Sequence, residues 1–110
     1  MTINVAQLIG ENAVSIQKGE ILYNEISRFW DSSELIELDF NNVKVFATPF
    51  FNRGVAPFLK DIKIEELQKK LSFKNMNDIG RSVLNHVIHN AIEYYSDEKL
   101  KEGIDKNIKG

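Results

Sequence analysis

The segment Glu34–Phe51, with the sequence ELIELDFNNVKVFATPFF, decides the fold. Its first part, Leu35–Phe40, has apolar residues at every second position from Ile36 onward and acidic residues at the two positions between them. Because successive side chains of a strand point to opposite faces, this alternation predicts a strand with one buried face. Two asparagines then indicate a turn, and a second extended stretch is predicted at Val43–Phe46.

The pair Thr48-Pro49 indicates the start of a helix. A threonine hydroxyl can accept a hydrogen bond from the free N–H groups of a first helical turn, and proline is favoured at the first helical position. A helix is therefore predicted from Pro49, with Thr48 as its cap. Gly54 and Pro57 predict a bend shortly after it, because proline cannot donate to the carbonyl one turn back.

Capping residues and apolar periodicity predict the remaining elements. The predicted strands are Thr2–Val5, Ala13–Ile16, with pairing to the first strand as one option, and Leu71–Asn75; the predicted helices are Val5–Ile9, Lys18–Trp30, Lys63–Lys70 and a last helix that Asn77 or Asp78 caps. Asn4 would cap the first of these helices, and Gly10 would end it. Gly80 lies inside the last helix, where glycine costs about 1 kcal/mol relative to alanine, so a close backbone approach is predicted there.

The length of 110 residues fits one domain. We expect this domain to span residues 1–95, and residues 96–110 to form a polar tail, either a frayed extension of the last helix or disordered. The tail has apolar residues only at Leu100, Ile104 and Ile108.

Composition excludes several classes of function. The net charge of −2, from 14 basic and 16 acidic residues, gives no general attraction to nucleic acid or anionic lipid. The chain has no cysteine, which excludes disulfides and thiolate chemistry. Neither a secretory signal nor a stretch of membrane-spanning length is visible, so a cytoplasmic location is expected.

A family resemblance supports the predicted order of elements. The segment Glu34–Phe51, together with Glu65-Glu66-Leu67 and Leu71–Asn77, resembles a STAS-like family of bacterial proteins of unassigned function. That family is related to the STAS domains of sulfate transporters and anti-sigma factor antagonists, and the resemblance covers about Ile3–Tyr95. It implies an α/β fold: a mixed β-sheet of about four to five strands, with helices packed mainly on one face.

The resemblance also implies a function. In anti-sigma factor antagonists, an ATP-dependent anti-sigma kinase phosphorylates a hydroxyl residue at the start of the second helix, and the unphosphorylated form binds that kinase. Thr48 is the matching position here. The sequence departs from this pattern at Ala47, Pro49 and Phe50, where the family pattern has an acidic residue, a serine and a glycine. Thr48 is therefore either a phosphoacceptor or simply a helix cap.

The start of the second main helix supplies the candidate partner-binding residues, which are Thr48, Phe50, Phe51, Asn52 and Arg53. Neighbouring residues on a helix are about 100° apart, so Phe50 and Phe51 cannot both face one core. Either one of them is exposed to a partner, or both are covered by different elements. Aromatic residues and arginine are common anchors of protein interfaces.

Two other groups have a chemical and a structural interpretation. His86, His89 and Glu93 are spaced so that they could share a metal, or they form a solvated helix face. Asp39 could be a catalytic carboxylate at the end of a strand, or it could bond the turn N–H groups around Asn41. For both groups the structural interpretation is the better supported, so no catalytic residue, metal or cofactor is predicted.

The sequence thus predicts a non-catalytic, protein-binding regulatory module that docks through the start of the second main helix. The resemblance suggests a histidine-kinase-like ATPase as its partner. A nucleotide-sensing STAS domain is the alternative, and a metal-dependent hydrolase that uses the histidine pair is a weaker one.

Overall fold

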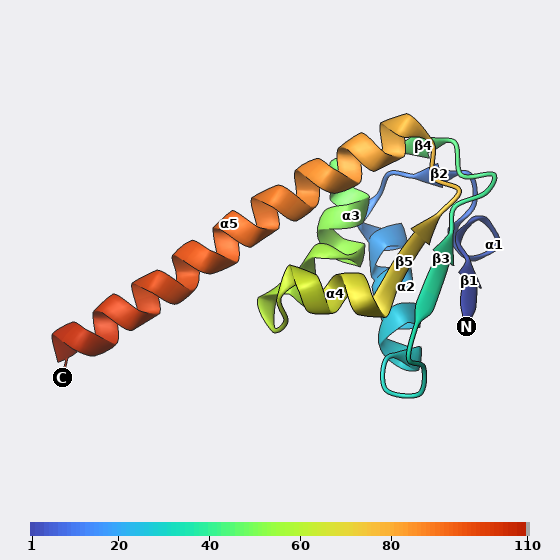
Figure 1. Cartoon of the computed structure of the whole chain (residues 1–110). Helices are drawn as coiled ribbons and strands as arrows, with labels where there is room; N and C mark the ends of the chain where they lie inside the picture. The colour runs from blue at the N-terminus through green and yellow to red at the C-terminus, as the bar shows by residue number, and fades with distance from the viewer. Residues whose placement is uncertain (110) are drawn as a thin grey trace.

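A computed structural model describes the backbone of residues 1–109 and the side chains of residues 1–96 (Figure 1). Strands and short helices alternate along most of the chain, and one long helix ends it. The elements are β1 (Thr2–Asn4), α1 (Val5–Ile9), β2 (Asn12–Ala13), α2 (Ile16–Phe29), β3 (Ile36–Asp39), β4 (Val45–Phe46), α3 (Thr48–Gly54), the 3₁₀ helix η1 (Ala56–Lys60), α4 (Ile64–Lys70), β5 (Leu71–Lys74) and α5 (Asp78–Lys109).

The strands form two separate parallel sheets. One has three strands in the order β1-β3-β5, and the other pairs β2 with β4. The α/β class is confirmed, but the expected single mixed sheet of four to five strands is wrong, because every pairing in the described chain is parallel. Asn42 has a left-handed φ of 70°, and the turn there separates β3 from β4. The segment at Ala13 pairs with β4 and not with β1.

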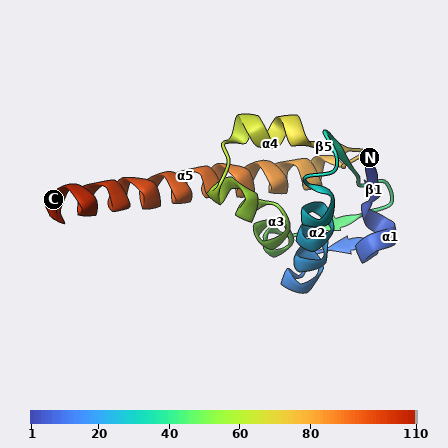
Figure 2. The ribbon, with the colours of Figure 1, turned by 90° about the horizontal axis from the view of Figure 1, so that it is seen from below.

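One face of the three-stranded sheet is apolar. Ile3, Leu38 and Phe73 lie side by side across the three strands, since Leu38 is the register partner of both other residues. Figure 2 shows α2 and α3 on the same side of this sheet, as right-handed crossovers between successive parallel strands require. The expectation that helices pack mainly on one face is confirmed. The opposite face is polar and uncovered.

Local capping sets the limits of the first two helices. The Asn4 side chain accepts from the backbone N–H of Gln7 at 3.0 Å, and Gly10 ends α1 with a left-handed φ of 86°. Both roles were predicted. Helix α2 starts at Ile16, earlier than predicted, because the Ser15 hydroxyl accepts from the N–H of Lys18 at 3.2 Å and acts as the cap.

Helices α2 and α3 cross at two glycines. A β-carbon on Gly19 would lie 2.5 Å from the backbone oxygen of Phe50 and 3.0 Å from the β-carbon of Arg53. A β-carbon on Gly54 would lie 3.1 Å from the backbone oxygen of Gly19. The two backbones therefore approach each other as closely as they do only because both positions lack a side chain.

Aromatic rings fill much of the core. Phe40, at the end of β3, lies 5.9 to 6.3 Å between ring centroids from Phe46, Phe51 and Phe73. The largest fully buried side chains are Phe40, Phe50, Phe51, Leu22, Ile26, Ile36, Leu38, Leu67, Val5, Val55 and Val87.

A second aromatic group joins α2 to η1. The ring of Phe58 lies between those of Tyr23 and Trp30, at centroid distances of 4.7 and 4.8 Å. Pro57 precedes it in the 3₁₀ turn that follows α3, so the predicted bend is confirmed. The ammonium of Lys70, from α4, lies 5.4 Å from the Trp30 ring centroid. Three elements thus meet at this stack.

Helix α5 begins beside the smaller sheet and extends far from the sheets (Figure 1). Asn77 caps it by accepting from the N–H of Gly80 at 2.8 Å. Gly80 makes room for side chains and not for the close backbone approach that the sequence suggested, because a β-carbon there would lie 2.6 Å from Cγ of Met76 and 2.8 Å from the ring of Phe46.

The helix continues to Lys109, and the molecule is 53 Å long. The division into a domain at 1–95 and a polar tail at 96–110 stays a prediction, because the side chains beyond Ser96 lie outside the described residues. Among the described helices, none combines the length and apolar character needed to cross a membrane.

The glycine crossing gives a stability prediction. Gly19→Ala should lower the free energy of unfolding by about 1–3 kcal/mol, because the added methyl group meets a backbone oxygen that cannot rotate away. Asn24→Ala is the matched control, because Asn24 lies exposed in the same helix. Urea denaturation of the two variants measures the difference. Equal or smaller destabilisation by Gly19→Ala would contradict the close crossing.

Candidate functional site

The smaller sheet leads directly into α3. The ladder of β2 and β4 continues past its last register pair, because the N–H of Ala47 donates to the carbonyl of Ala13 at 3.0 Å. Parallel strands end at a common edge, so the first residues of α3 lie beside the segment that follows β2. The predicted docking position at the start of α3 is therefore formed by two chain segments: the one that joins β4 to α3, and the one that follows β2.

The outer face of this ladder exposes apolar side chains. Ala13 and Phe46 are register partners and are buried, so their alternating neighbours face outward. These neighbours are Val14, whose exposed fraction is 38%, and Val45, whose exposed fraction is 49%. Sequence reasoning missed both valines. The alternation of buried and exposed side chains about Ala13 and Phe46 could have identified them, but it can be interpreted only once the pairing of β2 with β4 is known.

Thr48 lies at the first residue of α3 and is exposed. The predicted cap is wrong by one position. Ala47 precedes the helix in extended conformation and has no side-chain capping bond, and the proline follows Thr48. Among the described residues the Thr48 hydroxyl has no hydrogen-bond partner. Its hydroxyl is therefore not needed to hold the helix end.

The two adjacent phenylalanines are both covered. Phe50 and Phe51 are 0% exposed, and their rings lie edge to face at a centroid distance of 5.1 Å. Phe51 also stacks on Phe46 at 5.9 Å. Of the two interpretations of this pair, the one in which both are buried is confirmed. These rings support the surface from below and cannot contact a partner directly.

The other two candidate residues, Asn52 and Arg53, differ in whether contacts within the domain hold their side chains. Asn52 is exposed and lies four residues after Thr48, so the two share one face of α3. Arg53 is held against α2: its guanidinium lies 3.8 Å from Glu20 and 5.0 Å from the ring centroid of Tyr23. We therefore define the α3-start surface as Val14, Val45, Thr48 and Asn52, and assign Arg53 to the contact between α2 and α3.

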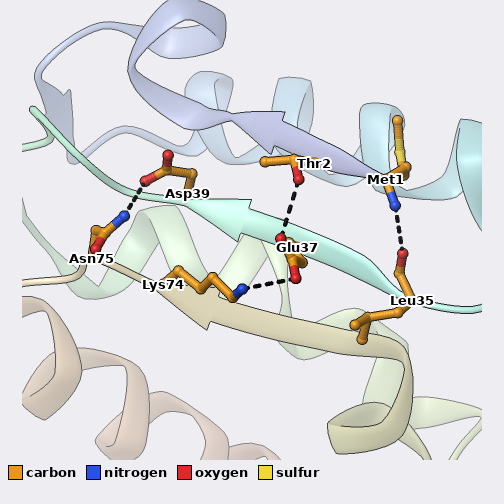
Figure 3. A network of polar contacts seen from close by, with 7 residues as sticks. All are labelled: Met1, Thr2, Leu35, Glu37, Asp39, Lys74 and Asn75. Atoms are coloured by element: carbon orange, nitrogen blue, oxygen red, sulfur yellow. Dashed lines mark hydrogen bonds and ion pairs between the residues drawn. The ribbon is translucent and has the colours of Figure 1, made fainter.

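The uncovered face of the larger sheet has a polar network, which Figure 3 shows. Glu37, in the central strand, accepts from Lys74 at 2.8 Å on one side and from the hydroxyl of Thr2 at 3.2 Å on the other. Chiefly because of the Lys74 bond, the pKa of Glu37 is lowered from its ordinary value. These contacts join all three strands and give each carboxylate oxygen of Glu37 one hydrogen-bond partner.

Asp39 has a structural role in the same network. It accepts from the Asn75 side chain and from the backbone N–H of Asn41, each at 2.9 Å. The first of these bonds is the larger cause, and together they lower the pKa of Asp39 from its ordinary value. The predicted bonding of the turn N–H groups is confirmed. The carboxylate fixes the two turns that follow β3 and β5.

The histidines of α5 are not gathered into one cluster. His89 lies 3.2 Å from Glu93, whereas His86 lies 3.1 Å from Asn90. Within the part of the chain whose side chains are described, no three His, Cys, Asp or Glu residues form a group that could hold a metal. The contacts of both histidines are made within the helix itself.

Comparison with known proteins gives the family. The profile of a family described as a STAS-like domain of unknown function matches residues 18–81, from α2 to the first turn of α5. This is more than half of the chain.

The chain belongs to this STAS-like family. Among curated proteins and solved structures, neither comparison found a match. The matched range of the STAS-like domain includes β3, β4 and α3, and therefore three of the four residues of the α3-start surface.

The Asp39 contacts predict how stability depends on pH. A carboxyl group whose pKa is lower in the folded state stabilises the fold above its unfolded pKa of about 3.9, and this contribution is lost as the pH falls through the folded value. Asp39→Asn should therefore lower the free energy of unfolding at pH 6, and its difference from the unsubstituted chain should narrow toward pH 3.

Chemical denaturation at a series of pH values measures this difference. Asn75→Gly is the matched variant, because glycine tolerates the φ of 59° at this position and removes only the side-chain bond. It should reduce the same pH dependence. A constant difference between Asp39→Asn and the unsubstituted chain at all pH values would contradict the assignment.

Proposed function

We infer that this STAS-like domain is a non-catalytic, protein-binding regulatory module that docks through the α3-start surface. The observation that carries the proposal is the pair of exposed valines, Val14 and Val45, beside the exposed Thr48. Apolar side chains next to polar ones at one place on a surface are typical of an interface core with its rim.

The buried aromatic packing beneath the α3-start surface favours binding of a partner. Val45 lies in a strand whose next residue, Phe46, is buried and stacks on Phe51 with an interplanar angle of 8°. A surface fixed by such packing loses little conformational entropy when a partner binds. The α3-start surface therefore suits a partner that docks without rearranging the domain.

Thr48 supplies a means of regulation. Its hydroxyl is exposed and is not required as a cap, so a change of charge there would leave α3 intact. A phosphate or carboxylate at Thr48, within the α3-start surface, would have to lose its hydration for a partner to bind there. This supports Thr48 as a modification site. The family resemblance supports a histidine-kinase-like ATPase as the partner.

Substitution of Val45 tests the surface. Immobilised protein should recover a partner from lysate of the native host, and Val45→Asp should reduce recovery at least tenfold, because it places a charge in the apolar centre. Ile21→Asp is the matched control: Ile21 is 45% exposed on α2, close to the 49% of Val45. Equal recovery by the unsubstituted chain and both variants would remove the α3-start surface from consideration.

Two substitutions at Thr48 separate charge from the hydroxyl. Thr48→Asp should weaken binding of the recovered partner at least tenfold, whereas Thr48→Ala should leave it within about threefold, because only the first introduces a charge. Titration of the purified pair measures both. If both variants bind equally well, charge at this position does not regulate docking.

A further inference from the structure

A groove lies along the free edge of the larger sheet and shares no residue with the α3-start surface. It has a volume of about 310 Å³ and is enclosed by α4, β5 and the first turns of α5. Its lining is mostly apolar, with Leu67, Leu71, Phe73, Leu84 and Ile88 among its walls. Phe73 and Ile88 are only half-buried, so apolar surface remains uncovered within the groove.

The edge strand offers unpaired backbone groups to this groove. β5 is the last strand of its sheet, and the carbonyl of Lys74 accepts from the N–H of Phe40 at 2.9 Å. The backbone groups of Lys74 therefore point toward β3. Successive residues of a strand alternate in this direction, so the N–H and carbonyl of Phe73 point outward, toward the open edge.

One charged residue lines the groove. Arg81 lines it beside the amide side chains of Gln68 and Asn85. Arg81 is exposed, and among the side chains of residues 1–96 it has no ion partner. The other two arginines of the sequence have acidic partners: Arg28 lies 3.8 Å from Glu25, and Arg53 lies 3.8 Å from Glu20. The groove thus combines apolar walls with one free guanidinium.

We propose that this groove binds an extended, acidic segment of a partner protein, which adds a strand beside β5. Backbone hydrogen bonds to Phe73 would fix the segment, and side chains would give it specificity. Residues of the segment level with Leu71 and Phe73 would point into the apolar groove. Its carboxylate would meet Arg81, which can hold such a group by two parallel hydrogen bonds.

The geometry specifies the sequence of the segment. Alternate side chains of a strand point to the same face and lie about 7 Å apart, so two apolar residues separated by one residue match the Leu71 and Phe73 levels. The intervening residue would face the polar side of the sheet, where Ser72 lies. One Asp or Glu within this short segment completes the pattern.

Selection of peptides tests the proposal. A displayed library of random eight-residue peptides, selected on the full chain, should yield sequences with two alternating apolar residues and an acidic residue. A synthetic copy of an enriched peptide should protect the Phe73 amide from hydrogen exchange. Methylation of the peptide's backbone nitrogens should weaken its binding at least tenfold, because methylated nitrogens cannot donate to the edge.

Matched variants locate the site. Arg81→Gln should weaken the peptide at least fivefold, and Arg28→Gln should leave it unchanged. Ile88→Ser should weaken it at least tenfold, whereas Ile92→Ser, one turn further along α5, should have no such effect. Thr48→Asp should also leave it unchanged, which separates this groove from the α3-start surface.

Three results would overturn the proposal: no enriched motif, binding that is indifferent to Arg81→Gln, or binding without protection of the Phe73 amide. Binding of the peptide without protection of the Phe73 amide would mean that the groove binds a helix. If decanoate displaced the peptide and the Phe73 amide stayed unprotected, the groove would bind a small apolar anion.

Discussion

The close crossing of α2 and α3 at Gly19 and Gly54 is the constraint on which the arrangement of the domain depends. With a β-carbon at Gly19 only 2.5 Å from the backbone of Phe50, the two helices could not keep their present separation. That separation lets α3 pack against α2 while Phe51 stacks on Phe46 of β4. The packing of the aromatic core therefore depends on how closely the backbones of α2 and α3 approach each other.

The position of the docking surface follows from the same packing. Phe50 and Phe51 are adjacent, yet both are buried, because α3 lies between other elements and is covered over a wide arc. Only its first turn and the Asn52 side remain exposed. The exposed apolar area therefore comes from Val45 in β4 and Val14 directly after β2, and not from α3.

Local signals in the sequence identified most of the helices and strands, although not all of their limits, but they did not identify how the strands pair. Asn4, Gly10 and Asn77 each act on the backbone within a few residues, and their roles were predictable for that reason. Residues Asn12–Ala13 make only two register pairs with a segment far along the chain, and such short strands have no periodicity to read. The exposed valines depended on that pairing, so they were missed with it.

The stack of Phe58 between Tyr23 and Trp30 gives the domain an optical reporter. Trp30 is the only tryptophan of the sequence, and it contacts η1 through Phe58 and α4 through Lys70. The emission spectrum of Trp30 therefore depends on whether η1 is packed against α2. Local detachment of that segment would change the fluorescence of a single residue without any added label, and could be followed in real time.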